Sequence, residues 1–205
     1  MPIKLNSTGG GSVSIDVPST ASTYTLTAPA ETGNIITTGT TSRVMPKAAM
    51  PSGSVIQVVQ AVITNTFSTT SQAWVDITGL SVNITPTSST SKILVLVDLA
   101  LGPTSGSGAS ARLLRNGSAI YVGDAAGSRL QALGEADGGA QYSTNKVGGI
   151  YLDSPATTSA VTYKLQTMNT TGTNTTYVGS TGADRNTTYY DPRTPNSITV
   201  LEIAQ

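Results

Sequence analysis

The dipeptide Asn116-Gly117, which lies between two extended and partly apolar runs, constrains the fold of this chain more than any other feature. Asn-Gly suits the two positive φ angles of a type I′ turn, so residues 110–123, SARLLRNGSAIYVG, predict a β-hairpin. The rest of the chain repeats the same style of short apolar runs separated by turn residues, and no segment has a convincing helical pattern. The sequence therefore predicts an all-β protein.

The composition excludes several kinds of chemistry. The chain has no Cys and no His, which removes disulfides, thiolate zinc sites and every catalytic arrangement built on Cys or His. The 11 basic and 11 acidic residues give a net charge of zero, and the basic residues are scattered, so we expect no nucleic-acid binding. No run approaches the roughly 20 apolar residues of a membrane span, and the first residues lack the apolar core of a secretory signal, so we expect no membrane insertion.

The acidic residues offer no catalytic or metal site. Glu135, Asp137 and the nearby Asp124 lack the spacing of a calcium-binding loop. They also lack the apolar surroundings that separate the pKa values of a glycosidase pair. The sequence therefore predicts a protein that is not an enzyme and that needs no cofactor and no metal.

Residues 1–37 form a first region of short strands. Apolar residues alternate with polar ones in the first run, and a second short run follows a proline. Two or three strands of this length bury little surface alone, so this region should require a partner. Its candidate docking residues are Val13, Ile15, Val17, Tyr24 and Leu26.

Residues 38–53 are predicted to be a linker, because they lack periodicity and contain two Met-Pro pairs. Residues 54–205 follow as one antiparallel β-sandwich, with turn residues such as Gly79 between its strands. Two long polar connections, Gly123–Lys146 and Gly179–Asn196, interrupt the pattern. The predicted strands are Val55–Ile63, Gln72–Ile77, Ser81–Ile84, Ser91–Leu101, Ala111–Arg115, Ala119–Val122, Val147–Leu152, Ala160–Met168, Thr175–Val178 and Ser197–Ile203.

The run Lys92–Leu101, KILVLVDLAL, is nearly apolar on both faces, whereas an antiparallel sandwich strand usually has one polar face. Either this strand is central and covered, or its outer face meets another subunit, and we favour the subunit interface. Val95 and Val97 are the candidate interface residues of this strand. Trp74, the only tryptophan, is a further candidate, with a sugar-binding platform as the alternative role.

The connection Gly179–Asn196 is the most functional-looking loop. It combines aromatic, acidic and basic side chains, which together could hold a glycan. The alternative is a surface loop that packs on its own subunit or on a neighbour. The candidate receptor-facing residues are Asp184, Arg185, Tyr189, Tyr190 and Asp191.

Most of the chain resembles a family of bacteriophage virion proteins. The opening, IKLNSTGGGSVSIDVPSTASTYTLTAPAETGNIITT, resembles an N-terminal module of tail-fibre and structural proteins of aquatic phages, including phages of cyanobacteria. The later pieces resemble the distal sandwich domain that is often joined to this module. These pieces are GSVIQVVQ (53–60), WVDITGLSVNITPTSSTSKILVLVDL (74–99), RLLRNGSAIYVGD (112–124), TYKLQTM (162–168) and SITVLEIAQ (197–205).

The resemblance implies a homotrimer with a jelly-roll-like sandwich, made in the host cytoplasm and carried on the virion. Residues 1–37 would dock to other virion proteins of the tail, baseplate or capsid, and the sandwich would face outward. The implied function is a short tail fibre or receptor-binding tip for host adsorption, with a host surface glycan as a possible partner. The alternatives are a capsid decoration protein that stabilises the shell, which the short linker favours, and a stand-alone carbohydrate-binding module.

Overall fold

The computed structural model describes residues 3–6, 9, 12–15, 50–187 and 189–205. The chain divides into two compact units, Met1–Arg43 and Val44–Gln205, and the division falls inside the segment predicted to be a linker. Of the predicted docking residues, Val17, Tyr24 and Leu26 lie outside the described residues.

The described part of the first unit is an antiparallel strand pair. β1 (Ile3–Asn6) pairs with β2 (Ser12–Ile15), and the register sets Leu5 opposite Val13 and Ile3 opposite Ile15. The alternating pattern around Val13 and Ile15 predicted the second of these strands. The pattern did not reveal the first strand.

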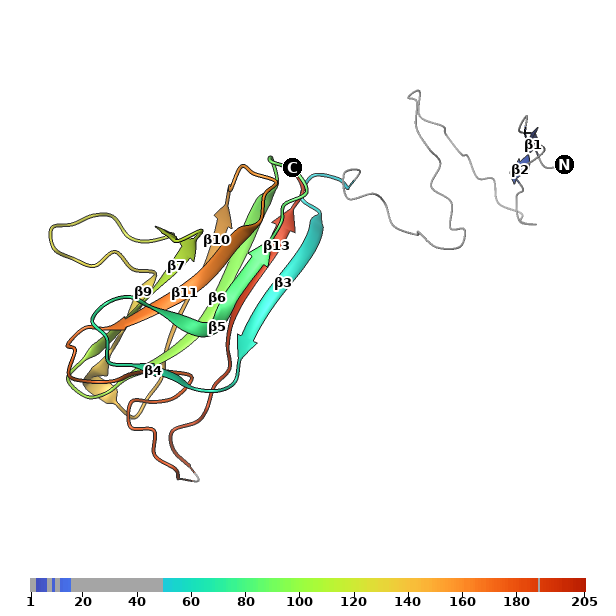
Figure 1. Cartoon of the computed structure of the whole chain (residues 1–205). Helices are drawn as coiled ribbons and strands as arrows, with labels where there is room; N and C mark the ends of the chain where they lie inside the picture. The colour runs from blue at the N-terminus through green and yellow to red at the C-terminus, as the bar shows by residue number, and fades with distance from the viewer. Residues whose placement is uncertain (1–2, 7–8, 10–11, 16–49, 188) are drawn as a thin grey trace, which may run out of the picture. The chain divides into compact units, whose positions relative to one another are not determined.

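Strands are the main regular secondary structure of the second unit, and loops connect them (Figure 1). Its one short helix is the 3-10 turn η2 (Gly138–Ala140), among the residues described. The strands are β3 (Val55–Ile63), β4 (Phe67–Thr69), β5 (Val75–Ile84), β6 (Lys92–Pro103), β7 (Gly108–Arg115), β8 (Ser118–Ile120), β9 (Gly134–Asp137), β10 (Asn145–Asp153), β11 (Val161–Asn169), β12 (Thr176–Val178) and β13 (Asn196–Ile203).

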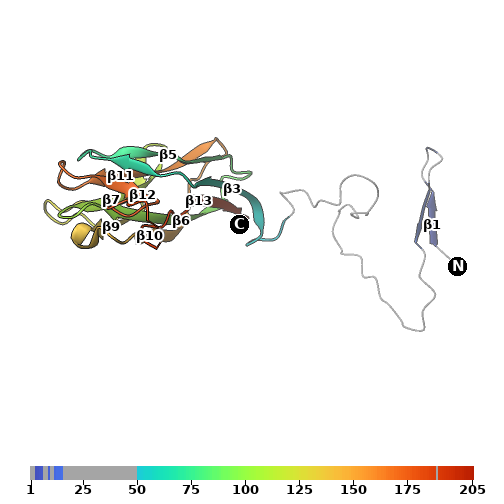
Figure 2. The same cartoon turned by 90° about the horizontal axis from the view of Figure 1, so that it is seen from below.

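These strands form two antiparallel sheets that pack face to face (Figure 2). The first sheet has the order β3–β13–β6–β10, with β12 and β4 added at the far end of β6. The second has the order β5–β11–β7–β8, and β9 also pairs with β7. The strand orders β3–β13–β6–β10 and β5–β11–β7–β8 are those of the two sheets of a jelly roll, which confirms the predicted antiparallel β-sandwich.

The predicted hairpin is present. Asn116 and Gly117 have φ angles of 48° and 87°, and the turn joins β7 to β8 with Arg115 opposite Ser118. Gly79 was expected to separate two strands, and this prediction is wrong because it lies inside one continuous strand, β5. Its φ of 88° and the register shift between β5 and β11 form a bulge there, so the chain bends without leaving the sheet.

The core fills the space between the two sheets. β6 supplies every second side chain to this core, and these side chains are Ile93, Val95, Val97, Leu99 and Leu101. The prediction that Val95 and Val97 face a neighbouring subunit is therefore corrected. The period of two places both residues inside, and the outward positions of the same strand are Leu94, Leu96 and Asp98.

Glu202 is a buried carboxylate at the end of β13. It accepts hydrogen bonds from the Thr87 backbone N–H at 2.6 Å, the Thr87 hydroxyl at 2.7 Å and the Gln57 amide at 2.6 Å. Burial raises the pKa of Glu202, but the hydrogen bonds around it outweigh burial and lower the pKa below its usual value. These bonds tie the loop before β6 to the last strand.

Because the folded pKa of Glu202 is depressed, its contribution to stability is present above the unfolded pKa and is lost as pH falls through the folded pKa. The variant Glu202→Gln places an amide N–H against these donors and should cost about 1–3 kcal/mol at neutral pH. We expect the difference in unfolding free energy between the two proteins to shrink below about pH 4. Urea denaturation at several pH values measures this difference, and one that does not change with pH would contradict the assignment.

Candidate functional site

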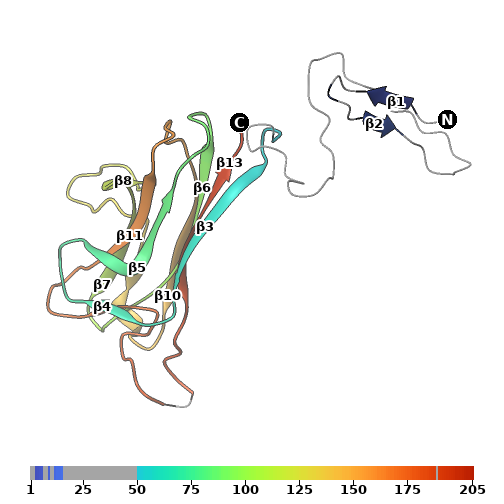
Figure 3. The ribbon, with the colours of Figure 1, turned by 45° about the vertical axis from the view of Figure 1, so that its right-hand side comes forward.

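The sandwich of the second unit has two distinct ends (Figures 1 and 3). At one end the chain enters β3 beside the C-terminus, where the Gly53 N–H donates to the Ala204 carbonyl and the Ala204 N–H donates to the Ser54 carbonyl, both at 2.9 Å. The loop between β12 and β13 projects from the opposite end. This loop contains the candidate receptor-facing residues of the sequence analysis. It lies at the end of the sandwich opposite to the chain entry.

The base of the loop is fixed to the end of β6. The Gly179 N–H donates to the Ala100 carbonyl at 2.9 Å, and the Asn196 side chain accepts from the Ala100 N–H at 2.6 Å. Gly182 lies so close to β6 that a Cβ atom there would be 2.1 Å from the Pro103 carbonyl oxygen. Any other residue at position 182 would push the loop off the strand.

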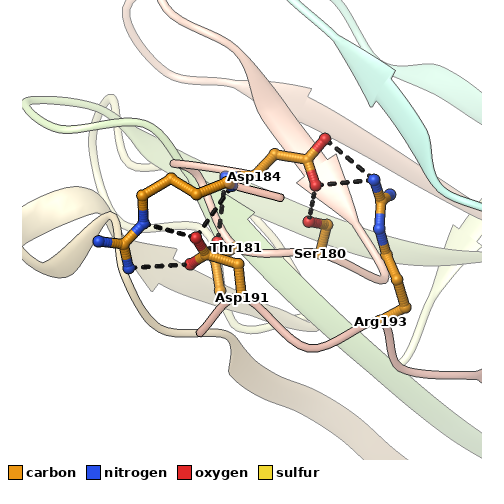
Figure 4. Close-up of polar contacts among 6 residues, drawn as sticks. Ser180, Thr181, Asp184, Asp191 and Arg193 are labelled. Atoms are coloured by element: carbon orange, nitrogen blue, oxygen red, sulfur yellow. Dashed lines mark hydrogen bonds and ion pairs between the residues drawn. The ribbon is translucent and has the colours of Figure 1, made fainter. Parts of the chain in front are cut away.

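Asp191 is the organising residue of the loop (Figure 4). Its side chain is fully buried and accepts from Arg185 Nε at 2.6 Å, the Arg185 backbone N–H at 2.9 Å and the Thr181 hydroxyl at 2.6 Å. The hydrogen bond from Arg185, followed by that from Thr181, lowers the pKa of Asp191 to about 2. The Arg185–Asp191 ion pair therefore persists across the neutral pH range.

A second ion pair lies beside the first (Figure 4). Asp184 accepts from the Ser180 hydroxyl at 2.6 Å and pairs with Arg193 at 2.8 Å. Asp184 and Asp191 adopt positive φ angles of 42° and 58°, conformations that Asp tolerates better than most residues. The two pairs hold the loop in one shape and neutralise its charges locally.

The Arg185 guanidinium contacts two tyrosine rings. Its central carbon is 4.3 Å from the ring centroid of Tyr142 and 5.0 Å from that of Tyr190, which is the geometry of cation–π contacts. Tyr142 lies in the connection before β10. The Ala183 N–H of the β12–β13 loop donates to the Gln141 carbonyl, and this hydrogen bond links the two segments. Tyr142 was missed in the sequence because only the fold brings it beside Arg185.

The outer face of the first sheet presents an apolar surface. The strand register sets Val58, Leu201, Leu94 and Leu152 in one row across all four strands. Leu96 and Ile150 lie in the adjacent row. Ile150, Val58 and Leu152 are 69%, 57% and 54% exposed, and we call these six residues the apolar sheet face. The strand Lys92–Leu101 thus has an apolar outer face, and it is made by Leu94 and Leu96 rather than by Val95 and Val97.

Trp74 lies on the opposite outer face. It precedes β5, and the Arg112 guanidinium carbon lies 4.5 Å from its ring centroid. Arg112 donates to Gln166, which in turn donates to Asp76, so the indole borders a polar network. Trp74, a candidate interface residue of the sequence analysis, therefore shares no surface with the apolar sheet face.

The acidic residues considered in the sequence are not gathered into a site. Glu135 lies in β9, and Asp137 caps the 3-10 turn by accepting from the Gly139 N–H at 3.2 Å. Within the described part of the chain no three acidic side chains come close enough to hold a metal ion. Among the same residues there is also no helix with the length and apolar character needed to cross a membrane.

No protein-family model and no curated protein matches this chain. Two similar solved structures are a mutant VP2 protein of infectious bursal disease virus, with 15% identity and a TM-score of 0.39, and the Gx strain of the same virus, with 17% identity and a TM-score of 0.36. The matches cover 72% and 74% of this chain but 36% and 43% of the viral chains. The chain thus spans less than half of their length, and at these TM-scores the likeness carries no inference about function.

Proposed function

We propose that this protein is a bacteriophage virion structural protein that projects from the particle as a homotrimeric short tail fibre or receptor-binding tip. The first unit, with the β1–β2 pair, docks to another virion protein. The jelly roll then faces outward. The chain performs no catalysis in this role and uses no cofactor.

The apolar sheet face is the observation that supports this proposal most strongly. Exposed apolar residues are ordinary when they are single, but here the exposed Val58, Ile150 and Leu152 adjoin three half-buried leucines in two adjacent rows, and together they form a contiguous patch of the kind that marks an interaction site. The row of Val58, Leu201, Leu94 and Leu152 contains no charged residue, and such a surface suits packing against other copies of itself. The Asp98–Lys146 ion pair, 2.6 Å long and exposed, borders this surface as a polar rim.

The two ends of the sandwich support an outward-facing domain. The chain enters beside the C-terminus, and the β12–β13 loop with its ion pairs and tyrosines lies at the other end. A domain held at its entry end would present this loop to its surroundings. The sequence resemblance to phage fibre proteins supports the same orientation.

The test is to locate the protein on the particle. We would raise antibodies against residues 44–205 and label intact virions of the phage that encodes the chain with gold, with pre-immune serum as the control. Gold at the tail or baseplate is the expected result. Gold over the capsid would favour the decoration protein, and purified virions that carry no gold would contradict a virion role.

A further inference from the structure

Two tyrosines contact one arginine at the far end of the jelly roll, and a third tyrosine precedes one of them in the chain. Tyr142, Tyr189 and Tyr190 are 58%, 89% and 62% exposed, and Arg185 contacts the rings of Tyr142 and Tyr190. We call these four residues the tyrosine tip. The chain has only eight tyrosines, so three in this small area are a marked concentration of exposed aromatic surface.

The tyrosine tip is held in place before any ligand arrives. Arg185 donates from Nε and Nη2 to the buried carboxylate of Asp191, which is fixed in turn by the Thr181 hydroxyl. A guanidinium fixed in this way orients the two rings that flank it. Preorganised aromatic surface lowers the entropy that a ligand must lose on binding.

The chemistry of the tip fits an uncharged pyranose better than an anion. Aromatic faces pack against the C–H groups of a sugar ring, and tyrosine hydroxyls provide polar contacts at the edge of the same rings. Both arginines of the loop are already paired with Asp184 and Asp191, so the loop offers no excess positive charge for an anionic ligand. Arg185 Nη1 has no protein acceptor among the hydrogen bonds of the described residues, and it remains available to a sugar hydroxyl.

We propose that the tyrosine tip binds a neutral glycan through its pyranose rings. The inference deepens the proposed function, since it assigns the recognition of a host surface to named residues. Tyr190 and Tyr142 supply the stacking surface, and Arg185 supplies the polar contact. Asp191 is a positioning residue that acts through Arg185.

The test uses the full chain and simple sugars. Saturation-transfer NMR would be recorded with the methyl glycosides of glucose, galactose, rhamnose and N-acetylglucosamine, and we expect at least one of them to bind with a dissociation constant of about 1 mM. Tyr190→Ala and Tyr142→Ala should each weaken binding at least about tenfold. Tyr190→Phe keeps the ring and should retain most of the affinity.

Tyr121→Ala is the matched control, because Tyr121 is also exposed but stacks on Tyr151, away from the tip. This variant should bind like the unaltered chain. No binding of any of the four sugars, or binding that Tyr190→Ala leaves unchanged, would overturn the inference. Either result would leave gold labelling of the virion unaffected, so the failure of this inference and the failure of the proposed function are distinguishable.

Discussion

The variant Ile150→Asp is expected to turn the proposed trimer into single chains. Ile150 is 69% exposed in one chain, so an aspartate there should hardly change the stability of the chain itself. In the trimer the same position would be covered, and an unpaired carboxylate would cost about 3 kcal/mol or more per chain. That cost weakens each contact about a hundredfold, which is enough to dissociate the trimer at micromolar concentration. Light scattering measures the resulting mass.

Thr78→Asp is the matched control for this variant. Thr78 is an exposed residue of β5 on the outer face of the other sheet, so the substitution adds the same charge without touching the apolar sheet face. The mass of this variant should equal that of the unaltered chain. If Ile150→Asp also kept the unaltered mass, the apolar sheet face would not be the interface.

Among the single variants proposed for this protein, Asp153→Ala is expected to lower the free energy of unfolding most. Asp153 is buried at the end of β10, where it pairs with Arg115 at 2.7 Å and accepts from the Tyr163 hydroxyl at 2.6 Å. Tyr163 has no exposed surface, and burial, followed by its hydrogen bond to Asp153, raises the pKa of the phenol. Removal of the carboxylate leaves this hydroxyl buried without an acceptor. The unfolding free energy should fall by about 3 kcal/mol.

A double variant separates the orphaned hydroxyl from the other losses. Tyr163→Phe alone should cost about 1.5 kcal/mol, because it removes one hydrogen bond to a charged group. Asp153→Ala combined with Tyr163→Phe should cost about as much as Asp153→Ala alone, since no unpaired hydroxyl remains. Urea unfolding at one fixed chain concentration gives all three values. Strictly additive losses would show that the two residues do not depend on each other.

The sequence predicted those parts of the fold that depend on local backbone chemistry. Asn116-Gly117 requires two positive φ angles wherever it folds, so its hairpin could be read directly from the residues. The period of two also gave the approximate bounds of the long strands. β9 was missed because its sequence, GEAD, has little strand propensity and is held in place by pairing with β7.

The face on which each residue of β6 lies could not be predicted from that strand alone. In a strand that is apolar on both faces, alternation separates Val95 and Val97 from Leu94 and Leu96 but does not say which pair is inside. Only the packing of the second sheet decides the matter. The second sheet packs against Ile93, Val95 and Val97, so these residues lie in the core. Leu94 and Leu96 remain on the outer face.

The loop was recognised from its composition, but its internal order was not. Of the candidate residues, Arg185 pairs with Asp191 and contacts the ring of Tyr190, whereas Asp184 pairs with Arg193, which the sequence analysis did not single out. Nothing in the sequence indicated that Tyr142 would join them across the fold. The buried roles of Asp153 and Glu202 were likewise invisible, because both depend on partners that are distant in the chain.

The solution mass of the intact protein tests the central claim most directly. Light scattering at several concentrations should give three times the 20.9 kDa of one chain, with no change on dilution through the micromolar range. Such a mass for the intact protein, together with single chains for Ile150→Asp, would mean that the apolar sheet face is covered by other copies of the chain. A mass of one chain at every concentration would contradict the trimeric fibre, and would favour a stand-alone carbohydrate-binding module instead.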